Sequence, residues 1–177
     1  MTYSGDRILL GNQRESRESR FRPWVLLVIP LIAILFQVYV PLFFQFLAYL
    51  DLPLLVTVYF ALMRRSPVAG TFIGALIGLA QDSLSKNKLG MYGIVNTLVG
   101  YFAASVGLRF DVDHPLIRLL LGFFFFFFHQ FFFWVLARAL LGQQLDFDLQ
   151  RTLVVGLLNA VVALFLFHFL DRLRETI

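Results

Sequence analysis

The sequence contains no cysteine and few charged residues, and both shortages limit what the protein can do. The lack of cysteine excludes disulfides, thiol catalysis and cysteine-ligated metal sites. The three histidines fall in different segments, so the spacing of a metal site is missing. The sequence also has no phosphate-binding loop, nucleophile elbow or pair of intramembrane carboxylates. We therefore expect neither an enzyme nor a protein with a metal or an organic cofactor.

Apolar residues dominate the composition instead. Of the 177 residues, 59% are hydrophobic and 15% are charged, and the mean hydropathy is +0.79. A water-soluble domain of this length cannot cover so much apolar surface, which indicates an integral membrane protein. We expect the 22 phenylalanines to face membrane lipid or neighbouring helices. The net charge of +4 is explained by basic residues at the inner face of a membrane, and no nucleic-acid partner is expected.

Residues 1–22 are polar and rich in arginine, and we expect them to form a cytoplasmic tail before a transmembrane domain at 23–177. A basic start before an apolar run also fits a secretory signal. A small-x-small cleavage site does not follow the run, however, so the first span is expected to be retained.

The transmembrane domain is predicted to be all-α and polytopic, with about six helices. Span one covers residues 23–40, and residues 41–50 are too short to cross alone, which favours an interfacial or re-entrant segment. Asp51 and Pro53 predict a helix start, with aspartate as N-cap and proline in the first turn. The other spans are predicted at residues 54–63, 67–84, 90–108, 115–141 and 151–170.

The third span contains a line of small residues on one helical face. Gly70, Gly74 and Gly78 recur every four residues, which leaves a smooth face that another backbone can approach closely. The fourth span carries Gly93 and Gly100 seven residues apart, again on one face. We expect these two helices to pack tightly against each other and the other helices to pack around the third span.

The distribution of basic residues predicts the orientation of the chain in the membrane. The N-terminal segment and every second loop after it hold eleven of the fifteen lysines and arginines. Both termini are therefore expected on the cytoplasmic side of the bacterial inner membrane, with the loops around residues 41–51, 85–88 and 142–150 outside.

Asp82 is the strongest candidate for a functional carboxylate, because it closes an apolar helix beside Gln81 and Ser83 where the bilayer meets water. The structural alternative is a polar end to a span that caps the following turn. Both interpretations are open at this point.

Other polar residues lie inside the predicted spans. Asn96 and Asn159 are most simply hydrogen-bonding contacts between helices. His129 lies at membrane depth in a run of phenylalanines, and it is either a proton relay or an inter-helix hydrogen-bonding residue. The hydrogen bond is favoured because its own helix offers no carboxylate partner.

The whole pattern resembles the MreD family of bacterial rod shape-determining membrane proteins. The resemblance depends on the length, the six spans, the Asp51-Leu52-Pro53 start of a short second span, and the block GTFIGALIGLAQDSL at residues 70–84. It continues with Leu89-Gly90 and a span that contains Asn96 and Gly100-Tyr101.

This resemblance implies a non-enzymatic subunit of the cell-elongation machinery. Members of the family associate with the bitopic protein MreC. Through MreC they contact MreB filaments and the polymerase and transpeptidase that build lateral peptidoglycan. The family is also similar to the six-helix S-component of energy-coupling-factor vitamin transporters.

Two functions therefore compete, a scaffold of the elongation complex and a small-molecule-binding subunit of a transporter. A transporter subunit needs polar and aromatic side chains in its outer loops to hold a ligand. The sequence offers only a small set there, namely Gln45, Tyr49, Asp51, Asp82 and Asn87, which favours the scaffold.

Overall fold

The computed structural model describes residues 21–85, 90–144 and 146–174 of the chain. Within these ranges all regular structure is helical, and the all-α prediction is confirmed. The elements are α1 (Pro23–Tyr39), η1 (Val40–Leu42), η2 (Gln45–Tyr49), α2 (Leu52–Arg64), α3 (Pro67–Leu84), α4 (Met91–Gly107), α5 (Pro115–Leu141) and α6 (Leu149–Asp171), where η marks a 3₁₀ helix. The tail predicted at residues 1–22 lies almost entirely outside the described residues.

Local sequence signals explain where several helices begin. The carboxylate of Asp51 accepts a hydrogen bond from the backbone N–H of Leu54 at 3.2 Å, which confirms the predicted N-cap of α2. Proline occupies the first turn of α1, α2, α3 and α5, where its missing N–H costs no helical hydrogen bond. Between α2 and α3 the chain reverses at Arg65, whose φ of 50° is left-handed.

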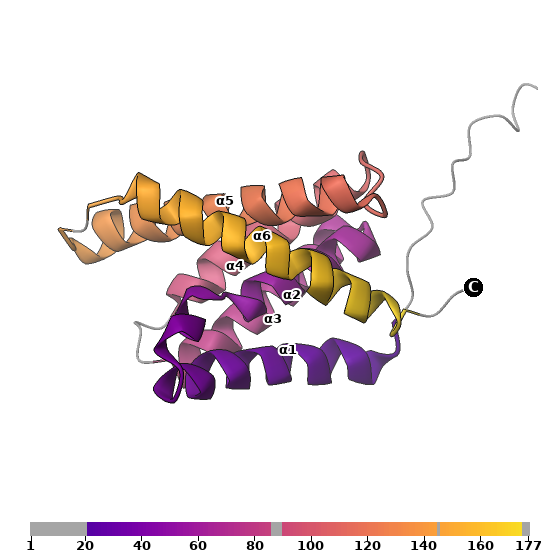
Figure 1. The fold of residues 1–177 in the computed structure, drawn as a ribbon, viewed down its shortest axis with the longest axis horizontal. Coiled ribbons are helices and arrows are strands. Elements are labelled where there is room, and N and C mark those ends of the chain that lie inside the picture. Colours follow the sequence, from indigo (N-terminus) through magenta and orange to yellow (C-terminus); the bar gives the residue numbers. More distant parts are fainter. Residues whose placement is uncertain (1–20, 86–89, 145, 175–177) are drawn as a thin grey trace, which may run out of the picture.

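α2 lies at the centre of the bundle. The residues from Pro53 to Met63 are all buried, and α2 packs against α1, α3, α4, α5 and α6. In Figure 1, α1 runs along one side of the molecule and α5 and α6 along the other. The expectation that helices surround the glycine helix is therefore wrong. Only one face of α3 is covered, and Phe72 and Leu76 on its other face are exposed. α2 takes the centre because it is apolar all round.

α3 and α4 form the closest helix pair, as their glycine spacing predicts. A Cβ added at Gly74 would lie 2.7 Å from the carbonyl carbon of Asn96, and one at Gly78 would lie 2.8 Å from the Cα of Gly93. Gly70 and Gly100 face each other in the same way. Side chains larger than hydrogen at these positions would push the two backbones apart.

Four helical segments are long and apolar enough to cross a membrane by length and composition. They are Pro23–Leu42, Gln45–Arg64, Pro115–Leu141 and Leu149–Asp171. The second joins η2 to α2, so the segment at residues 41–50 is partly continuous with the short second span. α4 is apolar but shorter than these four segments. α3 is neither among the four segments nor among the shorter apolar helices. The chain is a multi-pass membrane protein with six α-helices in its described residues, and membrane crossing by α3 and α4 stays a prediction.

The alternation of helices brings two of the regions predicted to face outward, around residues 41–51 and 142–150, to one end of the bundle, whereas the third predicted loop lies outside the described residues except for Ser85. Figure 1 shows η1, η2 and the connection between α5 and α6 at this end, and the connection between α4 and α5 at the other. We call the first the cavity end, because the polar cavity described below opens there, and the second the arginine end, after Arg118.

Candidate functional site

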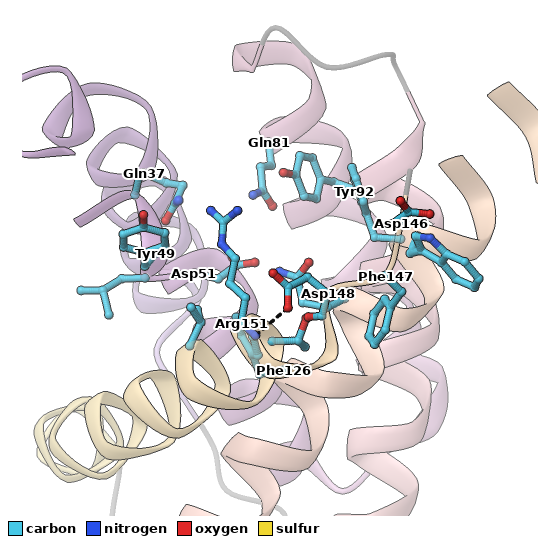
Figure 2. A pocket seen from close by; sticks show the side chains of 17 residues that line it. Gln37, Tyr49, Asp51, Gln81, Tyr92, Phe126, Asp146, Phe147, Asp148 and Arg151 are labelled. Carbon is cyan, nitrogen blue, oxygen red and sulfur yellow. Dashed lines mark hydrogen bonds between the residues drawn. The ribbon is translucent and has the colours of Figure 1, made fainter. Parts of the chain in front are cut away.

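A cavity of about 350 Å³ opens at the cavity end of the bundle. Its lining residues come from the end of α1, from η2 and the N-cap of α2, from the end of α3 and the start of α4, and from the second half of α5, the connection that follows it and the start of α6. Figure 2 shows side chains from these elements around one space, among them Gln37, Asp51, Gln81 and Arg151. The bundle therefore gathers polar groups from distant parts of the sequence into one site.

Asp51 lies on the wall of this cavity and is only 9% exposed. One of its carboxylate oxygens caps α2, and the other, Oδ2, lies 3.7 Å from Nδ1 of His129 in α5. At that distance the two groups are close enough for an ion pair but not for a hydrogen bond.

His129 is buried, and neither of its ring nitrogens makes a hydrogen bond in the part of the chain that the structure describes. Its ring is stacked with that of Tyr92, with centroids 5.9 Å apart and planes 10° apart. The predicted inter-helix hydrogen bond is therefore not formed. The hydrogen bond was predicted because α5 itself offers His129 no carboxylate. That prediction was wrong, since the carboxylate of Asp51, at the start of α2, lies beside His129.

Asn159 of α6 fixes the backbone at the start of α2. Its Oδ1 accepts the N–H of Asp51 at 2.9 Å, and its Nδ2 donates to the carbonyl oxygens of Tyr49 at 2.8 Å and Val155 at 2.9 Å. Asn159 is fully buried. The side chain thus acts as the inter-helix contact that the sequence predicts, and its partner is the backbone beside the cavity.

Gln81 and Asn96 connect α3 to α4 on the next wall. The Nδ2 of Asn96 donates to the Oε1 of Gln81 at 3.3 Å, and both residues are buried. Gln81 also lines the cavity. Asn96 is thus an inter-helix contact, and Gln81 combines such a contact with a place in the cavity wall.

Asp82 is not among the residues that line the cavity, and its carboxylate caps α4. Its carboxylate accepts hydrogen bonds from the backbone N–H groups of Gly90 at 3.0 Å, Tyr92 at 3.1 Å and Gly93 at 2.8 Å. The residue is 1% exposed. Three backbone donors and the positive end of a helix dipole satisfy this carboxylate. The structure therefore favours the structural alternative for Asp82 over an exposed functional carboxylate.

Sequence analysis named Tyr49 in an outer loop but missed the basic residue and the other aromatic walls of the cavity. The guanidinium of Arg151 lies over the ring of Tyr49, 5.4 Å from its centroid. Trp134 and Phe147 form another wall, with ring centroids 5.7 Å apart. The sequence did contain one signal for Arg151. Asp148 caps α6 by accepting the backbone N–H of Arg151, so an aspartate three residues before an arginine indicates that the arginine lies in the first turn of a helix.

A second polar cluster lies at the arginine end. Arg118 donates to Asp171 at 2.5 Å and to the carbonyl oxygen of Val112 at 2.7 Å, and it pairs with Asp113 at 3.3 Å. The hydroxyl of Tyr59 in α2 donates to the other oxygen of Asp171 at 2.9 Å. These bonds join α2, α5 and α6. We call Tyr59, Asp113, Arg118 and Asp171 the arginine cluster.

Groups of three or more side chains able to hold a metal ion do not occur among the described residues. The cavity instead combines carboxylates, amides, a guanidinium and aromatic rings. This arrangement is suited to reversible binding of a small molecule, because aromatic walls supply contact area and a few polar groups fix orientation.

Comparison with known proteins gives a family. The family model described as rod shape-determining protein MreD matches residues 18–175, which is nearly the whole chain. Searches of curated proteins and of solved structures found no match.

Proposed function

Because the chain belongs to the MreD family of rod shape-determining proteins, we propose that it is a non-enzymatic scaffold subunit of the bacterial cell-elongation complex that acts with MreC. The family match over residues 18–175 is the observation that carries this proposal. The partners are MreC and, through it, MreB filaments and the polymerase and transpeptidase of lateral peptidoglycan synthesis.

The interior of the protein is consistent with a scaffold. α2 is enclosed by its neighbours, α3 and α4 are in backbone contact, and polar bonds join helices at both ends. Such packing favours one arrangement of helices, which a scaffold needs in order to present the same surface to its partners.

The proposed location is the bacterial inner membrane with both termini in the cytoplasm. The arginine end is then cytoplasmic and the cavity opens outward. The support is the charge distribution, in which eleven of fifteen basic residues belong to segments predicted on one side.

Affinity purification of the tagged chain in mild detergent tests the scaffold proposal, with a similarly tagged, unrelated membrane protein of comparable size as control. We expect MreC among the companions of this chain and not among those of the control. Depletion of the chain is expected to turn rod-shaped cells round. Purification without MreC from cells that make it, together with normal shape after depletion, would contradict the proposal.

The cavity supports a second candidate, a small-molecule-binding subunit of a transporter. More polar and aromatic residues line the cavity than the sequence analysis found in the predicted outer loops. Such a subunit needs an energising partner, so the same purification would recover an ATPase module. Loss of the chain would then stop uptake of one solute and leave cell shape intact.

A further inference from the structure

The cavity carries a charge pattern that a scaffold does not require. Three aspartates and one arginine line it, namely Asp51, Asp146, Asp148 and Arg151, which gives an excess of two negative charges. The guanidinium belongs to an exposed residue at the start of α6 and lies over the Tyr49 ring. The deeper carboxylate is that of Asp51.

Aromatic rings surround these carboxylates. Six of the lining residues are aromatic, namely Tyr49, Tyr92, Phe126, Phe133, Trp134 and Phe147. Ring faces attract cations through their quadrupole, and this attraction grows where water is excluded. Carboxylates among aromatic rings therefore favour a positively charged organic group over a neutral or an anionic one.

Unused hydrogen-bonding capacity lies at the same place. The Oε1 of Gln37, a lining residue, is buried without a hydrogen-bond partner among the described residues. Within the described part of the chain, the one polar side-chain contact of Asp51 Oδ2 is the 3.7 Å approach of His129 Nδ1. Buried acceptors without donors are uncommon in folded proteins and call for a partner that brings N–H groups. An ammonium ion brings up to three such donors.

We propose that this cavity binds a small organic ammonium ion, with the ammonium group between Asp51 and Gln37 and the organic part against the aromatic walls. The volume of about 350 Å³ is at the lower end of the range for small-molecule sites. This site goes beyond the scaffold function and does not depend on it, because binding is measurable on the isolated protein.

The test measures the melting temperature of the purified full-length protein in a non-ionic detergent while phenethylammonium is added. The control ligand is 2-phenylethanol, which has the same ring and chain length but no charge. We expect a saturable rise with phenethylammonium, because a ligand that binds only the folded state stabilises it. An equal rise with the alcohol, or no rise with the amine, would overturn the proposal.

Two variants locate the site. Asp51→Asn keeps the shape and much of the capping ability of the side chain but removes its charge, and we expect roughly tenfold weaker binding or worse. Gln37→Met removes only the amide acceptor from a residue of similar length, and we expect binding to weaken severalfold. Asp113→Asn at the arginine end is the matched control, with unchanged binding. Equal loss in Asp113→Asn, or full binding in both cavity variants, would refute this location.

The natural source of the ammonium group is either a soluble amine or the headgroup of phosphatidylethanolamine. Nanodiscs of phosphatidylglycerol with and without phosphatidylethanolamine separate the two. A headgroup ligand would compete with phenethylammonium and raise its apparent dissociation constant in the mixed nanodiscs. A soluble ligand would leave that constant unchanged.

Discussion

Asn159 and Asp51 are 108 residues apart in the chain, yet the side chain of the first accepts the backbone N–H of the second at 2.9 Å. The bond attaches α6 to the first turn of α2. Since the same asparagine also donates to Tyr49, it holds both the end of η2 and the start of α2. The position of Asp51 in the cavity therefore depends on α6.

Replacement of Asn159 by Leu is expected to destabilise the folded protein by about 1–2 kcal/mol, because it leaves the N–H of Asp51 and the carbonyl of Tyr49 without their partner. The measurement is the free energy of unfolding in mixed micelles. The control is Leu158→Ala, at an exposed position on the same helix. A loss in the control as large as in Asn159→Leu would show that the hydrogen bonds contribute little.

Gly74→Leu is expected to prevent normal packing of α3 on α4, because a Cβ at this position already meets the backbone of Asn96 and Thr97. Leu76→Ala, on the exposed face of the same helix, should cost about 1 kcal/mol or less if that face meets lipid. The yield of folded protein after detergent extraction distinguishes them. Similar yields of the two variants would contradict the close contact.

The glycine contacts and the helix starts were predictable because they depend on local sequence. A spacing of four residues places small side chains on one face in any α-helix, and Asp51 with Pro53 specifies a helix start whatever surrounds it. The approach of Gly74 to Asn96 follows from that spacing once the two helices are adjacent.

The cavity was not predictable, because its groups meet only through tertiary packing. Nothing near His129 in the sequence indicates Asp51, and nothing near Gln37 indicates Arg151. The central position of α2 was missed for a related reason. A short apolar helix looks like an incomplete span until its neighbours are known to cover it on all sides.

Asp82→Asn should fold in nearly normal amounts and leave both cell shape and recovery of MreC unchanged, because the amide oxygen still accepts some of the backbone bonds at the start of α4. Asp82→Leu should lower the amount of folded protein by removing all three acceptor contacts. Quantitative immunoblotting and the purification described above measure both effects, with the exposed Ser83→Ala as control. A normal amount of Asp82→Asn protein with lost rod shape would instead assign a functional role to the charge.

Arg118→Met is expected to destabilise the protein by roughly 2–3 kcal/mol, because the partly buried Asp171 loses its cation and Val112 its donor. Asp171→Asn in the same background should recover part of that loss, since an amide tolerates the missing cation better than a carboxylate does. A double-mutant cycle with unfolding in mixed micelles measures the coupling. Additive losses would show that the two side chains act independently.

Orientation can be measured directly because the chain has no cysteine. Asp146→Cys at the cavity end should react with an impermeant thiol reagent in intact cells, whereas Asp111→Cys at the arginine end should react only after lysis. Both positions are exposed, so accessibility differs only by the side of the membrane. Labelling of Asp111→Cys alone in intact cells would reverse the proposed orientation.

α6 is fastened to α2 at two points, by Asn159 at the cavity end and by Asp171, through Tyr59, at the arginine end. The two contacts lie at opposite ends of the bundle, so together they set the register of α6 against α2. A variant that removes either bond leaves α6 held to α2 by a hydrogen bond at one end only.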